Sequence, residues 1–297
     1  TTDAGSGVIT LDTLAVTGTI ALATNSGGAA TVVNASGLNL ATSTLTGTFS
    51  GTATTGDITD SGTLTITGAA IFKTRVDGSN IVLDSSSNAF SAAVTMIADA
   101  GGEDFGNITF VDSAAIDFAT SASSNGDFYI NSSTDGTVGG NLSVTATTGN
   151  ITDTVALAVT GTTTLVTSAD NATIALGTTT NAFTGALTIT TNDSSGTDAD
   201  VTIDGGTTAL VIAASTIDGD LTLTSGNASG ITDSGTVTVG GNLAATADDN
   251  NGVITLDTLA VTGTIALATN SGGAAIIVNA TGIDFAASTV TGALSAT

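Results

Sequence analysis

The sequence lacks most of the residues that carry covalent chemistry or cross-links. Its 297 residues include no Cys, His, Pro or Trp. Without Cys there is neither a disulfide framework nor a thiol nucleophile, and without His the Ser/His/Asp and Cys/His catalytic arrangements are excluded. Because Pro is absent, nothing in the chain has to interrupt a ladder of backbone hydrogen bonds.

Positive charge is almost missing as well. The chain has 26 acidic residues against 2 Lys and Arg, for a net charge of −24. The basic patch that nucleic-acid binding needs cannot form, so we expect no nucleic-acid partner. We also expect no membrane span in this segment, since no apolar run reaches the roughly 18 residues that a span requires. Such acidity favours solubility and makes divalent cations plausible partners.

What the chain does contain favours β-structure. Thr is abundant and β-branched, 41% of residues are hydrophobic, and only 3% are aromatic. These proportions predict strands around a narrow core of Val, Ile, Leu and Ala. The 38 Gly are spread along the chain, as turn residues would be.

A long internal repeat governs the organisation of the chain. Residues 7–30 return unchanged as residues 252–275, which is an offset of 245 residues (252 − 7), and 37 of the 52 pairs from residues 1–52 and 246–297 are identical. We therefore expect one continuous segment over residues 1–297, cut from a longer periodic chain. It would comprise one macro-repeat (7–251) and the start of the next (252–297).

A shorter pattern recurs inside the long one. The stretches are GVITLDTLAVTG from Gly7, GDITDSGTLTITG from Gly56, GNITDTVALAVTG from Gly149 and SGITDSGTVTVGG from Ser229. Each holds short runs of alternating apolar and polar residues, the mark of strands with one buried face, separated by turn residues. We predict an all-β fold, a parallel, three-faced and right-handed β-helix (β-solenoid) of about 12 coils with about 24–25 residues each.

The recurring G-x-I-T-x-x-G-x-L-x-V-x-G pattern resembles the β-helical repeats of very large secreted bacterial adhesins, such as the filamentous-haemagglutinin-like exoproteins. The resemblance covers essentially the whole chain. It implies a right-handed parallel β-helix shaft, a secreted or cell-surface location, and a role in attachment or matrix building. It does not extend to that family's secretion domain or adhesive tip, so it implies no binding specificity.

Carboxylates are the remaining candidates for chemistry. Asp60, Asp153 and Asp233 occupy one recurring I-T-D position, but their coils are not adjacent. We interpret them as side-chain-to-backbone turn bonds rather than as ligands of a shared ion. Calcium, the one cofactor that the sequence suggests, would have its ligands where acids gather in TDADVTIDGG and ADDNNG, namely at Asp198, Asp200, Asp204, Asp248 and Asp249.

Three alternatives stay open beside a purely structural role. A calcium-stabilised surface-layer or biofilm matrix protein would use the acids just named. A polysaccharide-binding or polysaccharide-cleaving β-helix would use the two cations, Lys73 and Arg75, beside Asp77. An ice-binding β-solenoid would use outward pairs such as Thr65/Thr67, Thr145/Thr147 and Thr188/Thr190.

The sequence as a whole predicts a non-enzymatic structural shaft of a very large extracellular or cell-surface fibre or adhesin. The acids have no long insertion beside them from which an enclosing catalytic cleft could be built. As partners we expect further copies of the same repeat, assembled end to end or laterally, and a cell-surface or glycan ligand.

Overall fold

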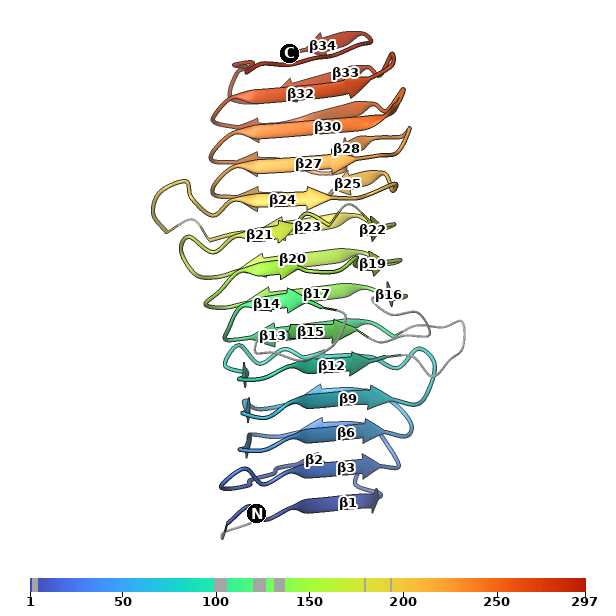
Figure 1. Cartoon of the computed structure of the whole chain (residues 1–297), viewed down its shortest axis with the longest axis vertical. Helices are drawn as coiled ribbons and strands as arrows, with labels where there is room; N and C mark the ends of the chain where they lie inside the picture. The colour runs from blue at the N-terminus through green and yellow to red at the C-terminus, as the bar shows by residue number, and fades with distance from the viewer. Residues whose placement is uncertain (2–4, 99–105, 120–126, 131–136, 179, 193) are drawn as a thin grey trace. The chain divides into compact units, whose positions relative to one another are not determined.

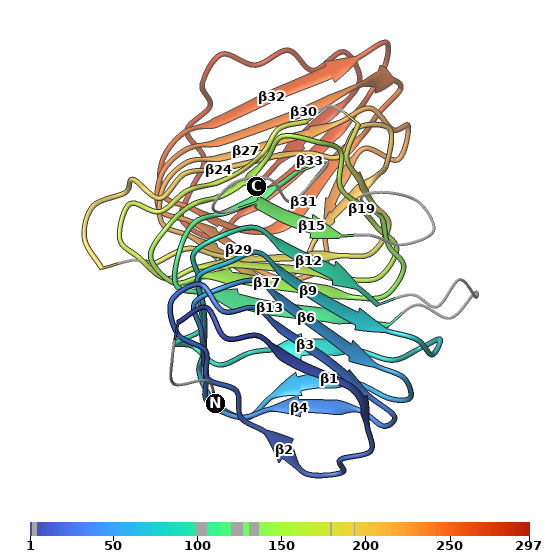
Figure 2. The same cartoon turned by 60° about the horizontal axis from the view of Figure 1, so that its bottom comes forward.

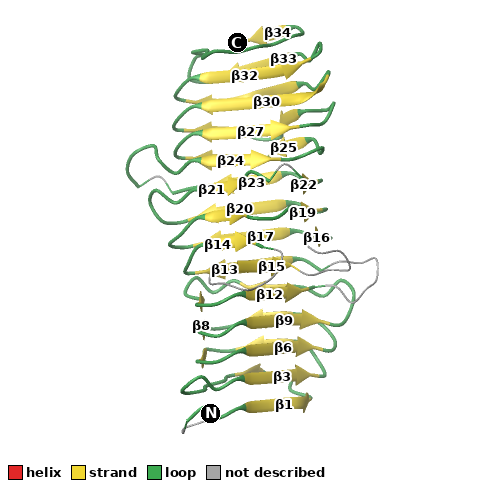
Figure 3. Ribbon diagram, viewed as in Figure 1, coloured by secondary structure: helices red, strands yellow, loops and turns green. Residues whose placement is uncertain are grey.

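The chain folds as an all-β parallel β-solenoid of about 12 turns, with about 22 residues per turn. The computed structural model describes residues 1, 5–98, 106–119, 127–130, 137–178, 180–192 and 194–297. The regular elements of these residues are β-strands, which lie one above another within each part of the chain (Figures 1 and 3). None of these residues belongs to a helix long and apolar enough to cross a membrane.

The chain divides into two compact units, Thr1–Thr148 and Gly149–Thr297. The first unit contains three parallel ladders, and Figure 2 shows several strands of the first ladder side by side. The first ladder runs in the order β1 (Ile9–Leu14), β3 (Ala30–Asn34), β6 (Phe49–Ala53), β9 (Ala70–Thr74), β12 (Val94–Ile97), β15 (Asp127–Ile130) and β14 (Ile116–Phe118). The second runs in the order β2 (Thr19–Ile20), β4 (Leu38–Leu40), β7 (Ile58–Asp60), β10 (Ile81–Leu83), β13 (Ile108–Asp112) and β17 (Leu142–Ala146). The third is short, with β5 (Ser43–Leu45), β8 (Leu64–Ile66) and β11 (Ala89–Phe90), and β16 spans Thr137–Val138.

The second unit repeats this plan. One ladder holds β18 (Ile151–Asp153), β21 (Ile174–Leu176), β24 (Val201–Asp204), β27 (Leu221–Ser225), β30 (Leu243–Asn250) and β32 (Ile265–Asn270). Another holds β20 (Thr163–Thr167), β23 (Leu187–Thr190), β25 (Leu210–Ile212), β28 (Ile231–Asp233), β31 (Ile254–Val261), β33 (Ala275–Asn279) and β34 (Leu294–Ala296). Beside them lie β26 (Ser215–Ile217) with β29 (Val237–Val239), and β19 (Ala158–Val159) with β22 (Ala182–Phe183).

The strand register explains why the turns are shorter than predicted. Phe49 pairs with Ala30 on one side and with Ala70 on the other, and both steps are shorter than 24 residues. The sequence pattern hid this, because a single turn holds several short strands with the same alternation. The three-faced arrangement agrees with the three ladders of the first unit, and right-handedness stays a prediction.

Aromatic side chains fill part of the core, and in this respect the prediction of a purely aliphatic interior was wrong. Phe49, Phe72, Phe90 and Phe110 are each at most 2% exposed, and successive ring centroids lie 5.3, 6.1 and 5.3 Å apart. Gly51 makes room for this column. A Cβ atom there would lie 2.8 Å from two ring atoms of Phe49. The Phe49 ring therefore occupies the space that a side chain at position 51 would need.

The two copies of the long repeat adopt the same register. In the first copy Ile9 pairs with Ala30, and Leu14 pairs with Asn34 beyond a bulge. In the second copy their equivalents pair in the same way, Ile254 with Ala275 and Leu259 with Asn279, again with a bulge between. Near-identical sequence has thus produced the same backbone pairing 245 residues apart. The continuity of the segment over residues 1–297 stays a prediction.

Candidate functional site

The I-T-D carboxylates bind backbone amides of the following turn. Each carboxylate lies at the end of a short strand and accepts hydrogen bonds from two successive amides that follow one turn later. The donors are Asp84 and Ser85 for Asp60 (3.0 and 3.3 Å), Gly177 and Thr178 for Asp153 (3.1 and 3.2 Å), and Asp257 and Thr258 for Asp233 (3.0 and 2.8 Å). The prediction of side-chain-to-backbone bonds is confirmed, although the donors belong to the next turn and not to the same one.

Two of these carboxylates also hold an inward-facing amide. The Nδ2 atoms of Asn88 and Asn181 donate to Asp60 and Asp153 respectively, each at 2.6 Å. Both Asn side chains are at most 1% exposed. Burial raises the pKa of Asp60, while the bonds from Asn88 and the two backbone amides oppose that rise. These carboxylates therefore act as structural acceptors that join consecutive turns.

Asp112 is a buried carboxylate that the sequence reasoning missed. It is 3% exposed, and its Oδ1 atom accepts a hydrogen bond from the amide of Phe90 at 3.1 Å. Burial raises the pKa of Asp112 to about 6, although backbone hydrogen bonds from Phe90, Ser113 and Ala114 act in the opposite direction. Asn88 makes the equivalent bond one turn earlier, to the amide of Leu64 at 2.8 Å. Asn88 and Asp112 lie 24 residues apart (112 − 88), about one turn, and this spacing was the available signal.

Asn and Asp side chains form a ladder at a second corner in each unit. Each residue precedes a strand, and its Oδ1 atom accepts a hydrogen bond from the amide of its counterpart in the next turn. In the first unit the ladder is Asp57, Asn80, Asn107 and Asn141, with three bonds of 2.8 Å. In the second unit it is Asp200, Asp220, Asn242 and Thr264, with bonds of 2.8, 2.6 and 2.9 Å. These bonds satisfy amides that the strand ladders leave free at the corner.

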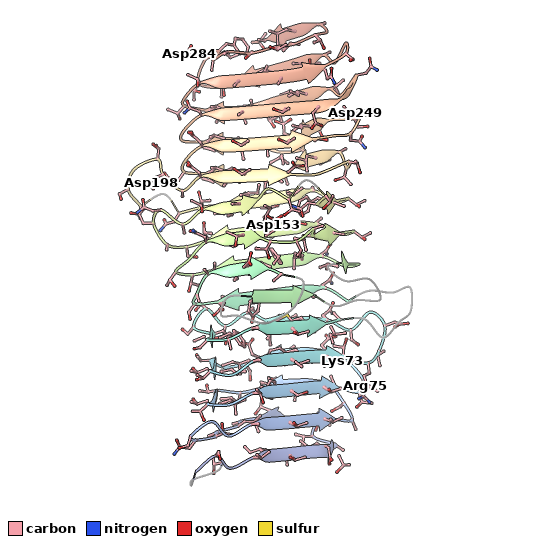
Figure 4. The ribbon with its side chains drawn as sticks, in the orientation of Figure 1. Lys73, Arg75, Asp153, Asp198, Asp249 and Asp284 are labelled. Carbon is pink, nitrogen blue, oxygen red and sulfur yellow. The ribbon has the colours of Figure 1, made fainter. Side chains whose placement is uncertain are left out.

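The structure divides the five calcium candidates. Asp204, Asp248 and Asp249 line one hollow of about 320 Å³ together with Gly206, Thr207 and Gly226. Burial, followed by the charges of Asp248 and Asp153, raises the pKa of Asp204. Asp200 is engaged in the corner ladder, and Asp198 lies in a protruding loop (Figure 4), where its amide donates to Asp218 at 3.2 Å.

No three acidic residues in the described part of the chain are arranged to hold a metal ion. The hollow unites Asp204 of TDADVTIDGG with Asp248 and Asp249 of ADDNNG. Asp198 and Asp200 do not line it. Calcium binding therefore stays a prediction, with Asp204, Asp248 and Asp249 as the residues that geometry unites.

The two cations lie on the outside of the first unit (Figure 4). Lys73 is in β9, where its Cα atom pairs with those of Thr52 and Ile97, and Arg75 follows the end of this strand. A surface hollow of the first unit, about 280 Å³, contains neither cation; it is lined by Thr17, Gly18, Ser36, Gly37, Leu38, Asn39, Asp57 and Thr59.

The outward threonines form short rows. Thr190, Thr216 and Thr238 occupy one register position, and Ala260 follows them. Of the threonines named as ice-binding candidates, Thr65 lies between Thr44 and Ala89. An ice-binding plane needs regular spacing over many turns, and these rows are interrupted after two or three.

Comparison with known proteins adds a family. No curated protein and no solved structure matches the chain. The family model described as repeats of unknown function (DUF5649) matches three stretches, residues 27–97, 105–190 and 198–268, which together span more than half of the chain. The chain therefore belongs to the family of repeats of unknown function DUF5649.

Proposed function

We propose that the chain is a structural, non-enzymatic shaft of a larger extracellular or cell-surface fibre or adhesin. The observation that carries this proposal is the long repeat, whose two copies adopt the same strand register and the same bulge 245 residues apart. Copying a whole number of turns lengthens a stack without disturbing its core, which is the change that selection for reach would favour.

The bonds between turns support a mechanical role. Backbone ladders join consecutive turns, and where an I-T-D carboxylate or a corner-ladder residue is present, shearing one turn from the next breaks its bonds as well. The buried Phe column and aliphatic side chains stack along the same direction. Outward Thr and Asp keep the surface polar, and a net charge of −24 opposes non-specific aggregation.

A chain with one additional copy tests the shaft. Residues 1–251 followed by residues 7–297 would preserve the sequence across the junction, because residues 7–30 equal residues 252–275. At about 22 residues per turn and ~4.8 Å per turn, the added copy should extend the particle by roughly 50 Å in electron micrographs. A control with 245 Gly/Ser residues in the same place should show no fixed increment. A broad distribution of lengths for the two-copy chain would refute the shaft.

The location is tested separately. Antibodies raised against the chain should label intact cells of the producing organism as strongly as lysed cells. Labelling that requires lysis would contradict a surface role without affecting the mechanical proposal.

A further inference from the structure

Within the part of the chain that the structure describes, Asp or Asn precedes Gly at four places. They are Asp77–Gly78, Asp204–Gly205, Asp218–Gly219 and Asn251–Gly252. At such a pair the backbone nitrogen of the glycine can attack the side-chain carbonyl carbon of the residue before it, because glycine has no Cβ atom to hinder the approach. The attack needs an amide without a hydrogen bond and a side chain that can turn toward it. The four pairs differ in both respects.

The Asp77–Gly78 pair lies in the turn between β9 and β10 and meets both requirements. Both residues are exposed, and among the described residues neither the carboxylate of Asp77 nor the amide of Gly78 has a hydrogen-bond partner. Gly78 has a φ of 74°, and a Cβ atom placed there would have no atom within 4 Å apart from those of the adjoining residues. The bond that closes the turn runs from the amide of Ser79 to the carbonyl of Val76 at 3.2 Å. A ring can therefore form here without breaking a described bond between turns of the solenoid.

The Asp204–Gly205 pair has the same two residues but lies inside a ladder. The amide of Gly205 donates to the carbonyl of Thr224 in the next turn at 2.9 Å. Gly205 is buried, and the Oδ1 atom of Asp204 accepts a hydrogen bond from the amide of Gly206 at 2.8 Å. Attack at this pair would first have to break a bond that joins two turns, at the cost of leaving a buried carbonyl without a partner.

The Asp218–Gly219 and Asn251–Gly252 pairs are also bonded. The amide of Gly219 donates to the carbonyl of Ala199 at 3.4 Å, and the carboxylate of Asp218 accepts a hydrogen bond from the amide of Asp198 at 3.2 Å. The amide of Gly252 donates to the carbonyl of Asp249 at 3.1 Å. Both glycines are buried. Of the four pairs, Asp77–Gly78 is thus the one whose attacking amide is exposed and unbonded.

We propose that Asp77 is a modification site, where aspartate converts to isoaspartate through a cyclic imide, and that hydrogen bonding suppresses the corresponding reaction at the other three pairs. The Gly78 nitrogen forms a bond to Cγ of Asp77, and its proton leaves with the carboxyl hydroxyl as water. Water then adds to the main-chain carbonyl carbon and breaks the bond from that carbon to the Gly78 nitrogen. The chain now continues through Cγ, and the former main-chain carbonyl has become a carboxylate. This inference does not rest on the proposed shaft.

Mass spectrometry of an aged sample tests the selectivity. The folded chain and the same chain unfolded in concentrated urea are incubated at neutral pH, and isoaspartate is located in proteolytic peptides by electron-transfer dissociation. In urea Asp77, Asp204 and Asp218 should form isoaspartate at similar rates. In the folded chain Asp77 should keep a rate within about threefold of its urea value, while the rates at the other two should fall at least about tenfold. A similar fall at all three sites, or no fall at any of them, would overturn the proposal.

The variant Asp77→Asn provides a matched comparison within one molecule. It places an Asn-Gly pair at positions 77 and 78, so that the same reaction, with ammonia as the leaving group, can be followed there and at Asn251–Gly252. The increase in peptide mass on deamidation reports both sites in the folded chain. Deamidation at position 77 should be at least about tenfold faster than at Asn251. Equal rates, or a faster reaction at Asn251, would show that the hydrogen bonds do not set the rate and would overturn the proposal.

Discussion

For two threonines of one strand, we predict that the same substitution changes the free energy of unfolding in opposite directions. Thr163 and Thr167 both lie in β20 with inward-facing side chains that are 0% and 1% exposed. Thr167 Oγ1 donates to the carbonyl of Ala172 at 3.1 Å. Thr163 Oγ1 has no hydrogen-bond partner among the described residues. Burying a hydroxyl without a partner costs about 1–3 kcal/mol.

Replacing each threonine by valine isolates the contribution of the side-chain hydroxyl to stability. Valine keeps the β-branch and so leaves strand propensity nearly unchanged. Thr163→Val should raise the free energy of unfolding by about 1–2 kcal/mol, because it removes an unpaired buried oxygen. Thr167→Val should lower it by about 1 kcal/mol, because it removes a formed bond.

Urea denaturation followed by far-ultraviolet circular dichroism measures both effects. The two sites share a strand, so any stepwise unfolding of the solenoid affects them alike, and the difference between the two midpoints is the robust quantity. The midpoint should be higher for Thr163→Val than for Thr167→Val. Equal midpoints, or a lower one for Thr163→Val, would refute the reasoning that the Thr163 hydroxyl is unsatisfied.

Three further experiments probe the corner, the core and the hollow. The pKa of Asp112 is about 6 in the folded chain against 3.8 in the unfolded one, so its contribution to stability is present below pH 3.8 and is lost as pH rises through 6. Asp112→Asn should remove that pH dependence and raise the free energy of unfolding at pH 7 by up to roughly 3 kcal/mol. A urea midpoint that keeps the pH profile of the wild-type chain would contradict this. Gly51→Ala should destabilise by about 1–3 kcal/mol through its contact with Phe49, and adding Phe49→Leu should recover part of that loss in a double-mutant cycle, whereas strict additivity would exclude the contact. If calcium binds the hollow, a chelator should lower the melting temperature of the wild-type chain, and Asp248→Asn with Asp249→Asn should abolish that shift; a melting temperature insensitive to both calcium and chelator would remove the calcium prediction.

The fold class followed from sequence because the buried and exposed sides of a strand alternate with a fixed period of two. The register did not follow, because alternation alone cannot say which of several similar runs pairs with which. Phe49, Phe72 and Phe90 show the difficulty. Phe49 and Phe72 occupy different register positions of one ladder, and Phe90 lies in another ladder, so that only the fold brings the three rings together.

The candidate site was predicted only in part, because its geometry also depends on the strand register. The I-T-D carboxylates were recognised as backbone acceptors, but the turn that supplies the donors depends on register. Asp204 and Asp248 were named as candidates in separate stretches, and only the stacking of β24 and β27 with β30 brings them to one hollow. Asp112 was missed because a lone Asp after an apolar run looks like an ordinary surface turn residue.

The corners rather than the faces set the register of this stack. Along the outer face Thr31, Ser50 and Ile71 succeed one another at one position, so the face accepts both polar and apolar side chains there. At the corners, each carboxylate or amide oxygen must meet the amide of one particular residue in the next turn, and a shift by one residue would leave both groups without a partner. The second copy differs from the first at Phe49 and Gly51, where it has Leu294 and Ala296. It keeps Ser43, Thr46 and Asn34 as Ser288, Thr291 and Asn279, all of which bond the turn below. A repeat that varies its core packing but keeps its corner bonds can therefore be copied without a shift in the register of its turns.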